Sequence, residues 1–557
     1  MIKDRRVKAA VSKIARNAHK ELSEEAIKYS FNNDGLIERL YNVNHQIVFG
    51  RRGTGKTHLF KFFSAYINNN PENEYALYID LLSISGSSHS MNESRHSNYT
   101  KYVHIYKDLL SEIHKTLCEI AFSGRYLKPS NCEEEIELRK ELDCLADAIL
   151  QIDTIISNVR VEERSNKSHS SSTSRDKAAE IGIHFTGVTF EGGLAKGHSI
   201  SSRNESDYYR VYEIDNHENL VYRTVNYSLD RILSILDVKL FVMIDEWSSI
   251  DVNLQPYCAE LMRRTLFTNN RIIVKLAAIE FRTKLCVITS QNRIGLEMGS
   301  DIYIVLDFDN IFLFDENPDK VIEHMSKLLY NHLKVALKDD FIGIFKLNES
   351  EATHQHEKLM RSLFDDDIAR LYFIKCAEGN PRDLINILDK CFEHLKDSES
   401  TITLENVLTS AKYWYSSAKE SNLSKESDLS TDLMPRFKYL VNRVIELEST
   451  RSFILKERLF DTTLQMLHEK RIIHILKKRH TYFSDLGEPY LVFIIDFAYC
   501  AYLMGQQRIN LDIFDKDEYE KLMRFAEPLE YHSYTMYDLK RNIRNVVIDS
   551  WPDIHVS

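Results

Sequence analysis

The pattern of apolar and polar positions divides much of the chain into strand-like and helix-like stretches. Mostly apolar runs bounded by polar residues predict strands at 46–49, 75–84, 239–244, 272–279 and 302–308. The run at 75–84, YALYIDLLSI, is typical of a strand buried on both faces. A helical stripe follows the first run, with apolar side chains at Leu59, Phe60, Phe62, Phe63, Tyr66 and Ile67. Strands that alternate with helices favour a parallel sheet, and therefore an α/β fold.

The same pattern predicts several domains, because 557 residues are too many for one core. We expect a basic helical segment at 1–35, a core at 36–316, an all-helical lid at 317–419 and a C-terminal domain at 432–557. In the C-terminal domain, helical stretches precede two apolar runs that a polar loop separates. Helices followed by a hairpin predict a winged helix.

A long insertion at 101–228 interrupts the core. Its first part contains helical stretches near 102–121 and 133–156. The segment 160–207 is rich in Ser and has little sustained periodicity, which predicts a flexible surface segment. A hairpin at 182–190 is the alternative for part of it, because that run alternates.

The segment GRRGTGKT at Gly50–Thr57, called the phosphate loop below, matches the pattern G-x-x-x-x-G-K-[ST]. It lies between a predicted strand and a predicted helix, where its backbone N–H groups and the helix dipole can face phosphate oxygens. Lys56 is expected to reach the β and γ phosphates of ATP, and the Thr57 hydroxyl to ligate Mg²⁺. The residues expected to bind ATP are Gly50, Arg51, Arg52, Gly53, Thr54, Gly55, Lys56, Thr57 and His58.

A second motif supplies carboxylates. The apolar run at 239–244 ends in Asp245 and Glu246, and ligands gather at the carboxyl ends of parallel strands. Asp245 is expected to hold Mg²⁺ and Glu246 to polarise the attacking water. The pair therefore predicts ATP hydrolysis and not binding alone.

Composition and charge narrow the classes of function. The chain lacks an uninterrupted apolar run of about 18 residues, an apolar signal-peptide core and any C-x-x-C pair, which predicts a cytoplasmic protein with no membrane span. A net charge of −11 argues against a uniformly basic surface. The first twenty residues carry seven Lys and Arg, which leaves a solvated amphipathic helix or a local nucleic-acid contact as alternatives.

Several segments together resemble the AAA+ ATPases, specifically the origin-recognition-like (initiator-type) clade seen in many bacterial genomes. They are the phosphate loop, IDEWSS at 244–249, LQPYCAELMRRTLF at 254–267, VKLAAIE at 274–280 and GNPRDL at 379–384. The resemblance implies a P-loop NTPase sheet of the AAA+/ASCE type with a helical lid and a C-terminal winged helix. It also implies that Arg382, at the start of a lid helix, contacts the γ-phosphate and joins Lys56 and Glu246 as a catalytic residue.

Two features depart from the family's pattern. The strand that ends at Glu280 lacks the usual polar sensor residue, and Glu280 or Arg282 is the substitute. The arginine that would act on a neighbouring subunit is not identified, so a homo-oligomer is an open expectation. Its candidates are Arg263, Arg264, Arg282 and Arg293.

Two functions remain open from the sequence. In the first, Mg-dependent ATP binding and slow hydrolysis drive a conformational switch in a DNA-associated process, with the basic cluster 477–480 of the winged helix on DNA phosphates. In the second, the chain is a signalling or scaffold ATPase of an anti-phage defence system. Its winged helix would then bind an effector or other partner protein instead of DNA.

Overall fold

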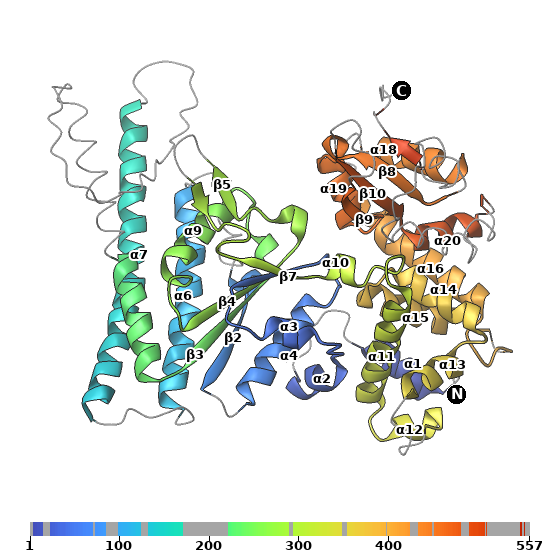
Figure 1. The fold of residues 1–557 in the computed structure, drawn as a ribbon, viewed down its shortest axis with the longest axis horizontal. Helices are drawn as coiled ribbons and strands as arrows, with labels where there is room; N and C mark the ends of the chain where they lie inside the picture. The colour runs from blue at the N-terminus through green and yellow to red at the C-terminus, as the bar shows by residue number, and fades with distance from the viewer. Residues whose placement is uncertain are drawn as a thin grey trace, which may run out of the picture. The chain divides into compact units, whose positions relative to one another are not determined.

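A computed structural model describes much of the chain in detail. The described residues are 4–14, 23–70, 73–84, 98–123, 132–170, 221–288, 293–347, 354–396, 398–423, 433–447, 450–480, 489–506, 508–509, 546–548 and 551. The chain forms two compact units (Figure 1). Unit 1 comprises 1–37, 49–62 and 306–557, and unit 2 comprises 38–48 and 63–305. The phosphate loop therefore belongs to the same unit as the lid and the C-terminal domain.

Most of the main sheet lies in unit 2, and its strand order is β2-β3-β4-β1-β7. The strands are β1 (Gln46–Phe49), β2 (Glu74–Asp80), β3 (Lys239–Asp245), β4 (Ile272–Ala278) and β7 (Tyr303–Asp307). Strand β3 pairs in parallel with both β2 and β4. The side chains of β4 are all buried, as a central strand covered on both faces requires. The chain is thus an α/β protein.

Strand β2 differs from the sequence-based expectation. The predicted strand at 75–84 stops at Asp80, and residues 81–84 are helical. Only Ala76 and Ile79 of β2 are fully buried. Among the described strands, β2 is the last of the order and pairs with β3, and this edge position agrees with its intermediate burial.

The described part of the insertion is helical and packed. Helix α6 (Asn98–Phe122) contacts both α7 (Cys132–Ser170) and α9 (Gln255–Thr265), as Figure 1 shows. The Tyr106 hydroxyl donates to Thr265 Oγ1 at 2.8 Å and joins α6 to α9. Helix α7 continues through Ser170, whereas the rest of the Ser-rich segment, including the alternative hairpin at 182–190, lies outside the described residues.

The segment expected to be a lid, 317–419, lies in unit 1 and its described part is helical; it is called the lid below. Its helices are α11 (Pro318–Leu337), α12 (Asp340–Phe345), α13 (Gln355–Leu363), α14 (Asp367–Ala377), α15 (Pro381–His394) and α16 (Leu404–Trp414), followed by a π-helical turn at Tyr415–Glu420. The N-terminal helix α1 (Arg5–Lys13) packs its apolar face against α11 and α15. Arg6 pairs with Asp340 at 2.8 Å. The basic N-terminal helix is therefore amphipathic, with its apolar side buried on the lid.

The C-terminal domain contains a small sheet in the order β11-β8-β10-β9. Its elements are α18 (Leu433–Leu440), a π-helical turn at Val441–Glu446, β8 (Ser452–Lys456), α19 (Thr462–Glu469), β9 (Ile473–His480), β10 (Tyr490–Ile495), α20 (Phe497–Gly505) and β11 (Val546–Ile548). Strand β10 pairs antiparallel with β8 and β9, and β11 pairs in parallel with β8. The basic cluster 477–480 forms the end of β9, where His480 pairs with Tyr490. Across the described ranges, no helix has the length and apolar character needed to cross a membrane.

Candidate functional site

The phosphate loop connects β1 to α4 (Lys56–Asn68) through a turn that needs glycine. Gly53 and Gly55 have φ of +91° and +102°, a left-handed region that disfavours other residues. A Cβ on Gly53 would lie 2.7 Å from Asn380 Oδ1 and 2.8 Å from Arg382 Cβ. Gly53 is therefore required both by the backbone conformation and by the close approach of the lid.

Lys56 lies in the curl of this loop. Its side chain is buried, and Nζ donates to Gly50 O at 2.5 Å and to Arg51 O at 3.1 Å. A phosphate chain at the loop would offer anionic oxygens to this ammonium in place of neutral carbonyls, and bonds to charged acceptors are the stronger ones. The enclosed ammonium at the N-terminus of α4 fits a bound anion.

The neighbouring residues of the loop have varied surroundings. Thr54 Oγ1 donates to Arg51 O at 2.9 Å and closes the turn. Thr57 follows Lys56 in the first turn of α4. The next residue, His58, directs Nε2 to Ile27 O at 3.0 Å, so this nitrogen carries the hydrogen and the ring faces the N-terminal helix α2 (Glu24–Ser30).

The lid contacts the phosphate loop through the start of α15. The Asn380 side chain caps this helix by accepting from the N–H groups of Arg382 and Asp383, and its Nδ2 donates to Arg52 O at 3.1 Å. The Arg382 N–H also points to Gly53 O at 3.4 Å. The structure thus brings Arg382, expected from the resemblance, directly against the phosphate loop.

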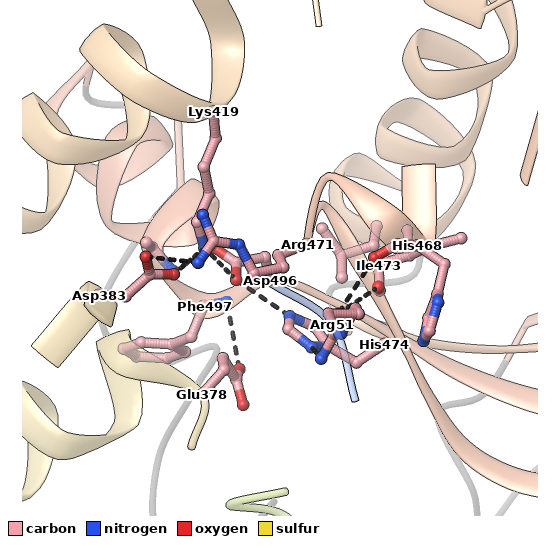
Figure 2. A network of polar contacts seen from close by, with 12 residues as sticks. Arg51, Glu378, Asp383, Lys419, His468, Arg471, Ile473, His474, Asp496 and Phe497 are labelled. Carbon is pink, nitrogen blue, oxygen red and sulfur yellow. Dashed lines mark hydrogen bonds and ion pairs between the residues drawn. The ribbon is translucent and has the colours of Figure 1, made fainter. Parts of the chain in front are cut away.

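Arg51 has an environment that its place in the motif does not suggest. Its guanidinium is buried and pairs with Asp309 at 2.8 Å. It also donates to His468 O, Ile473 O and His474 Nδ1 in the C-terminal domain, at 3.2, 3.4 and 2.8 Å, as Figure 2 shows. Burial raises the pKa of Asp309, but the opposing effects, led by the charge of Arg51 and including its hydrogen bonds, together outweigh burial and hold that pKa at about 2. The Arg51 side chain is therefore directed at the C-terminal domain.

The acidic pair lies in unit 2, at the carboxyl end of β3. Asp245 is fully buried and accepts from the Tyr78 hydroxyl at 3.0 Å and from the Glu246 N–H at 2.8 Å. Burial, and then the charge of Asp245, raise the pKa of Tyr78, which keeps the phenol protonated as a donor. These two bonds use about two of the four acceptor sites of a carboxylate. Tyr78 is a partner that sequence reasoning did not find, since its contact depends on the pairing of β2 with β3.

Glu246 has a left-handed backbone, with φ of 56° and ψ of 38°. This conformation costs a residue other than glycine roughly 1–3 kcal/mol, and such residues gather at functional sites. It ends the strand abruptly and starts the short turn Trp247–Ser249, in which Trp247 is buried. The left-handed backbone therefore supports the hypothesis that Glu246 is a functional residue that polarises the attacking water.

The candidate sensor and subunit-contact residues are also in unit 2. Glu280 and Arg282 form a 3₁₀ turn after β4, and the Gln255 side chain donates to Arg282 O at 2.8 Å. Arg263 and Arg264 both pair with Glu260, at 2.8 and 2.7 Å, and Arg293 pairs with Glu297. Arg263, Arg264 and Arg293 therefore have carboxylate partners within the chain.

Comparisons with known proteins add little to this geometry. No family model and no curated protein matches the chain. Among solved structures, the crystal structure of Cdc6p from Pyrobaculum aerophilum is similar over 88% of this chain and 99% of that chain, at 10% identity and a TM-score of 0.30. A likeness at this score supports no conclusion about function, so we base the site on the contacts above.

The site residues that sequence reasoning missed act through tertiary contacts. Asp309, His474 and Arg471 are far from the motif in sequence, and none belongs to a recognisable pattern. Arg471 donates to Arg52 O at 3.4 Å and to Asp383 at 2.8 Å. For Asp309 the position two residues after strand β7 is the one available signal, because residues near the ends of parallel strands gather near ligands.

Proposed function

We propose that this protein is an ATPase that binds the triphosphate of ATP at the phosphate loop. The observation that carries the proposal is the conformation of the loop itself. Gly53 and Gly55 have left-handed backbones, the Lys56 ammonium is enclosed by loop carbonyls, and α4 begins at that lysine. This combination is the physical requirement for holding a phosphate chain.

In this proposal each half of the site has a separate task. Strands β1 and β3 belong to one sheet and lead into the phosphate loop and into the acidic pair. Lys56 exchanges its carbonyl partners for β and γ phosphate oxygens, and Glu246 orients the attacking water and accepts its proton. Thr57 and Asp245 would hold Mg²⁺, and the ion would neutralise part of the phosphate charge.

The contacts of the lid support a conformational switch. Asn380 and Arg382 bond to the loop carbonyls of Arg52 and Gly53. A γ-phosphate beside Gly53 would give the Arg382 guanidinium an anionic partner, which changes the free energy of the lid position. ATP binding and hydrolysis would therefore alternate two arrangements of the lid on the loop.

The target of the switch is proposed as DNA, through the basic end of β9. One observation favours the alternative, a partner protein of a signalling or defence ATPase. Lys478 Nζ donates to Asp307 at 3.0 Å within the chain, so a cation of this cluster is already paired. Each phosphate contact adds salt-dependent affinity, and internal pairing lowers the number of cations that can contribute.

The test of ATP binding is isothermal titration calorimetry with Mg·ATP on the full chain. Lys56→Ala should abolish measurable binding, because the substitution removes the ammonium that faces the phosphates. Lys61→Ala, on the same helix outside the loop, is the matched control and should bind as the unchanged protein does. Equal affinity of the Lys56→Ala and Lys61→Ala variants would rule out the phosphate loop as the ATP site.

A further inference from the structure

A buried polar chain joins the phosphate loop to the C-terminal domain. It starts at Arg51, whose guanidinium pairs with Asp309 and donates to acceptors of α19 and β9 (Figure 2). A surface arginine would sample many rotamers, whereas this guanidinium donates in four directions at once. Its side chain therefore has one orientation as long as the C-terminal domain is in place.

The direction of the bonds can be assigned from chemistry. A guanidinium only donates, so Nδ1 of His474 accepts from Arg51 and Nε2 must carry the hydrogen. That Nε2–H donates to Asp496 Oδ2 at 3.0 Å, and Asp496 is paired with Lys419 at 2.7 Å. Burial, and then the charge of Arg51, lower the pKa of His474 to about 4, which agrees with a neutral ring.

The chain of contacts then returns to the lid and the loop. Lys419 lies 3.3 Å from Asp383 on α15, and Arg471 joins Asp383 at 2.8 Å and reaches Arg52 O at 3.4 Å. Figure 2 shows Asp383 beside Lys419 and Arg471, with its carboxylate directed at their nitrogens. Two adjacent loop residues, Arg51 and Arg52, are thus held by the C-terminal domain.

Arg51 also determines where Lys56 lies. The Arg51 carbonyl accepts from Lys56 Nζ at 3.1 Å and from Thr54 Oγ1 at 2.9 Å. Its N–H donates to Asp309 Oδ1 at 3.1 Å. Movement of the Arg51 guanidinium would therefore shift the backbone that fixes the ammonium expected at the phosphates.

We propose that His474, supported by Asp496, is a positioning residue for ATP binding, and that it acts by holding Arg51 and so the shape of the phosphate loop. The inference rests on the proposed function, because it concerns the same ATP site. It adds a requirement that the sequence motif does not contain, namely the docked C-terminal domain. By thermodynamic linkage, ATP would strengthen the docking of that domain by the same factor.

The test compares His474 variants in the full chain by calorimetric titration with Mg·ATP. His474→Phe keeps a ring but removes the Nδ1 acceptor of Arg51. It should weaken ATP binding about tenfold, because a hydrogen bond to a charged group is costly to lose. His474→Asn restores an acceptor near the position of Nδ1 and should recover most of the affinity. A purely structural histidine would lower the thermal unfolding midpoint in both variants and leave the affinity of the folded protein unchanged.

Two further variants make the inference specific. Adding His474→Phe to Arg51→Met should weaken binding no further than Arg51→Met alone, because the histidine acts through that arginine. Arg436→Met removes a C-terminal ion pair, that with Asp461, outside this chain of contacts, and should lower stability without changing ATP affinity.

The outcomes separate the two proposals. If the unchanged protein binds ATP, Lys56→Ala does not, and His474→Phe binds within about twofold of the unchanged protein, the positioning role is wrong and the ATP site stands. Additive losses in the double variant also overturn it. If the unchanged protein binds no ATP, the proposed function itself fails. Should His474→Phe not fold, Arg51→Lys keeps the charge but loses the fork of donors, and unchanged affinity in that variant overturns the inference.

Discussion

Replacing Gly53 with alanine tests the contact between the lid and the phosphate loop. The backbone at φ of +91° costs an alanine roughly 1–2 kcal/mol. The new methyl group would also meet Asn380 Oδ1 at 2.7 Å and Arg382 Cβ at 2.8 Å, well inside van der Waals contact. Overpacking of this kind costs about 1–3 kcal/mol, so the total loss of unfolding free energy should be about 2–5 kcal/mol. Because the lid must move away, ATP turnover should fall as well.

Gly299→Ala is the matched control for this prediction. Gly299 has a similar φ of +85°, and a Cβ there would meet nothing within 4 Å. It should therefore lose roughly 1–2 kcal/mol from backbone strain alone. Urea denaturation gives the unfolding free energies, and a coupled phosphate-release assay gives turnover. Equal destabilisation by the two alanines, with turnover intact in Gly53→Ala, would refute the close lid contact.

Three other predictions follow from the site and its surroundings. Glu246→Gln should keep ATP binding and lose turnover by roughly 10²–10⁴-fold in the same assay, and unchanged turnover would disprove the general-base role. Folding lowers the pKa of His474 from 6.5 to about 4, because the folded protein favours the neutral ring. This preference stabilises the folded state fully above pH 6.5, and about 3 kcal/mol of unfolding free energy is lost as the pH falls to 4. Urea denaturation of His474→Asn should show a smaller acid loss than the unchanged protein, and equal losses would contradict this linkage. If the C-terminal domain binds DNA, affinity should fall with salt, and Lys477→Ala with Arg479→Ala should reduce that slope by about 2; no slope, or no change on substitution, favours a protein partner.

The sheet could be predicted from the sequence because its strands have nearly continuous apolar runs. Strands β1, β3, β4 and β7 lie within a residue or two of the expected ranges. The end of β2 could not be predicted in the same way. The residues at 81–84 look like a continued strand, and only the strand order shows that, of the strands the structure describes, β2 pairs with β3 at the edge of the sheet.

The candidate site also has one part that the local sequence predicts and another part that depends on tertiary contacts. The phosphate loop is a local pattern, so its eight residues carry the information for the turn and for the position of Lys56. The burial of Arg51 depends on Asp309 and His474. Both partners are far from Arg51 along the chain, so no local sequence pattern predicts these contacts. The basic cluster gives a third case, because the sequence shows Lys478 but not its pairing with Asp307.

The ion pair between Arg51 and Asp309 has a consequence for how this protein can evolve. The middle positions of a G-x-x-x-x-G-K-[ST] loop tolerate many residues in principle, since their backbone binds the phosphates. Here Arg51 is committed to a buried carboxylate and to a histidine 423 residues further along the chain. Loss of one charge alone would leave the other buried and uncompensated, which costs about 3–5 kcal/mol. Among homologues, positions 51, 309 and 474 should therefore change together, and their covariation would mark the lineages in which the C-terminal domain and the phosphate loop form one inherited unit.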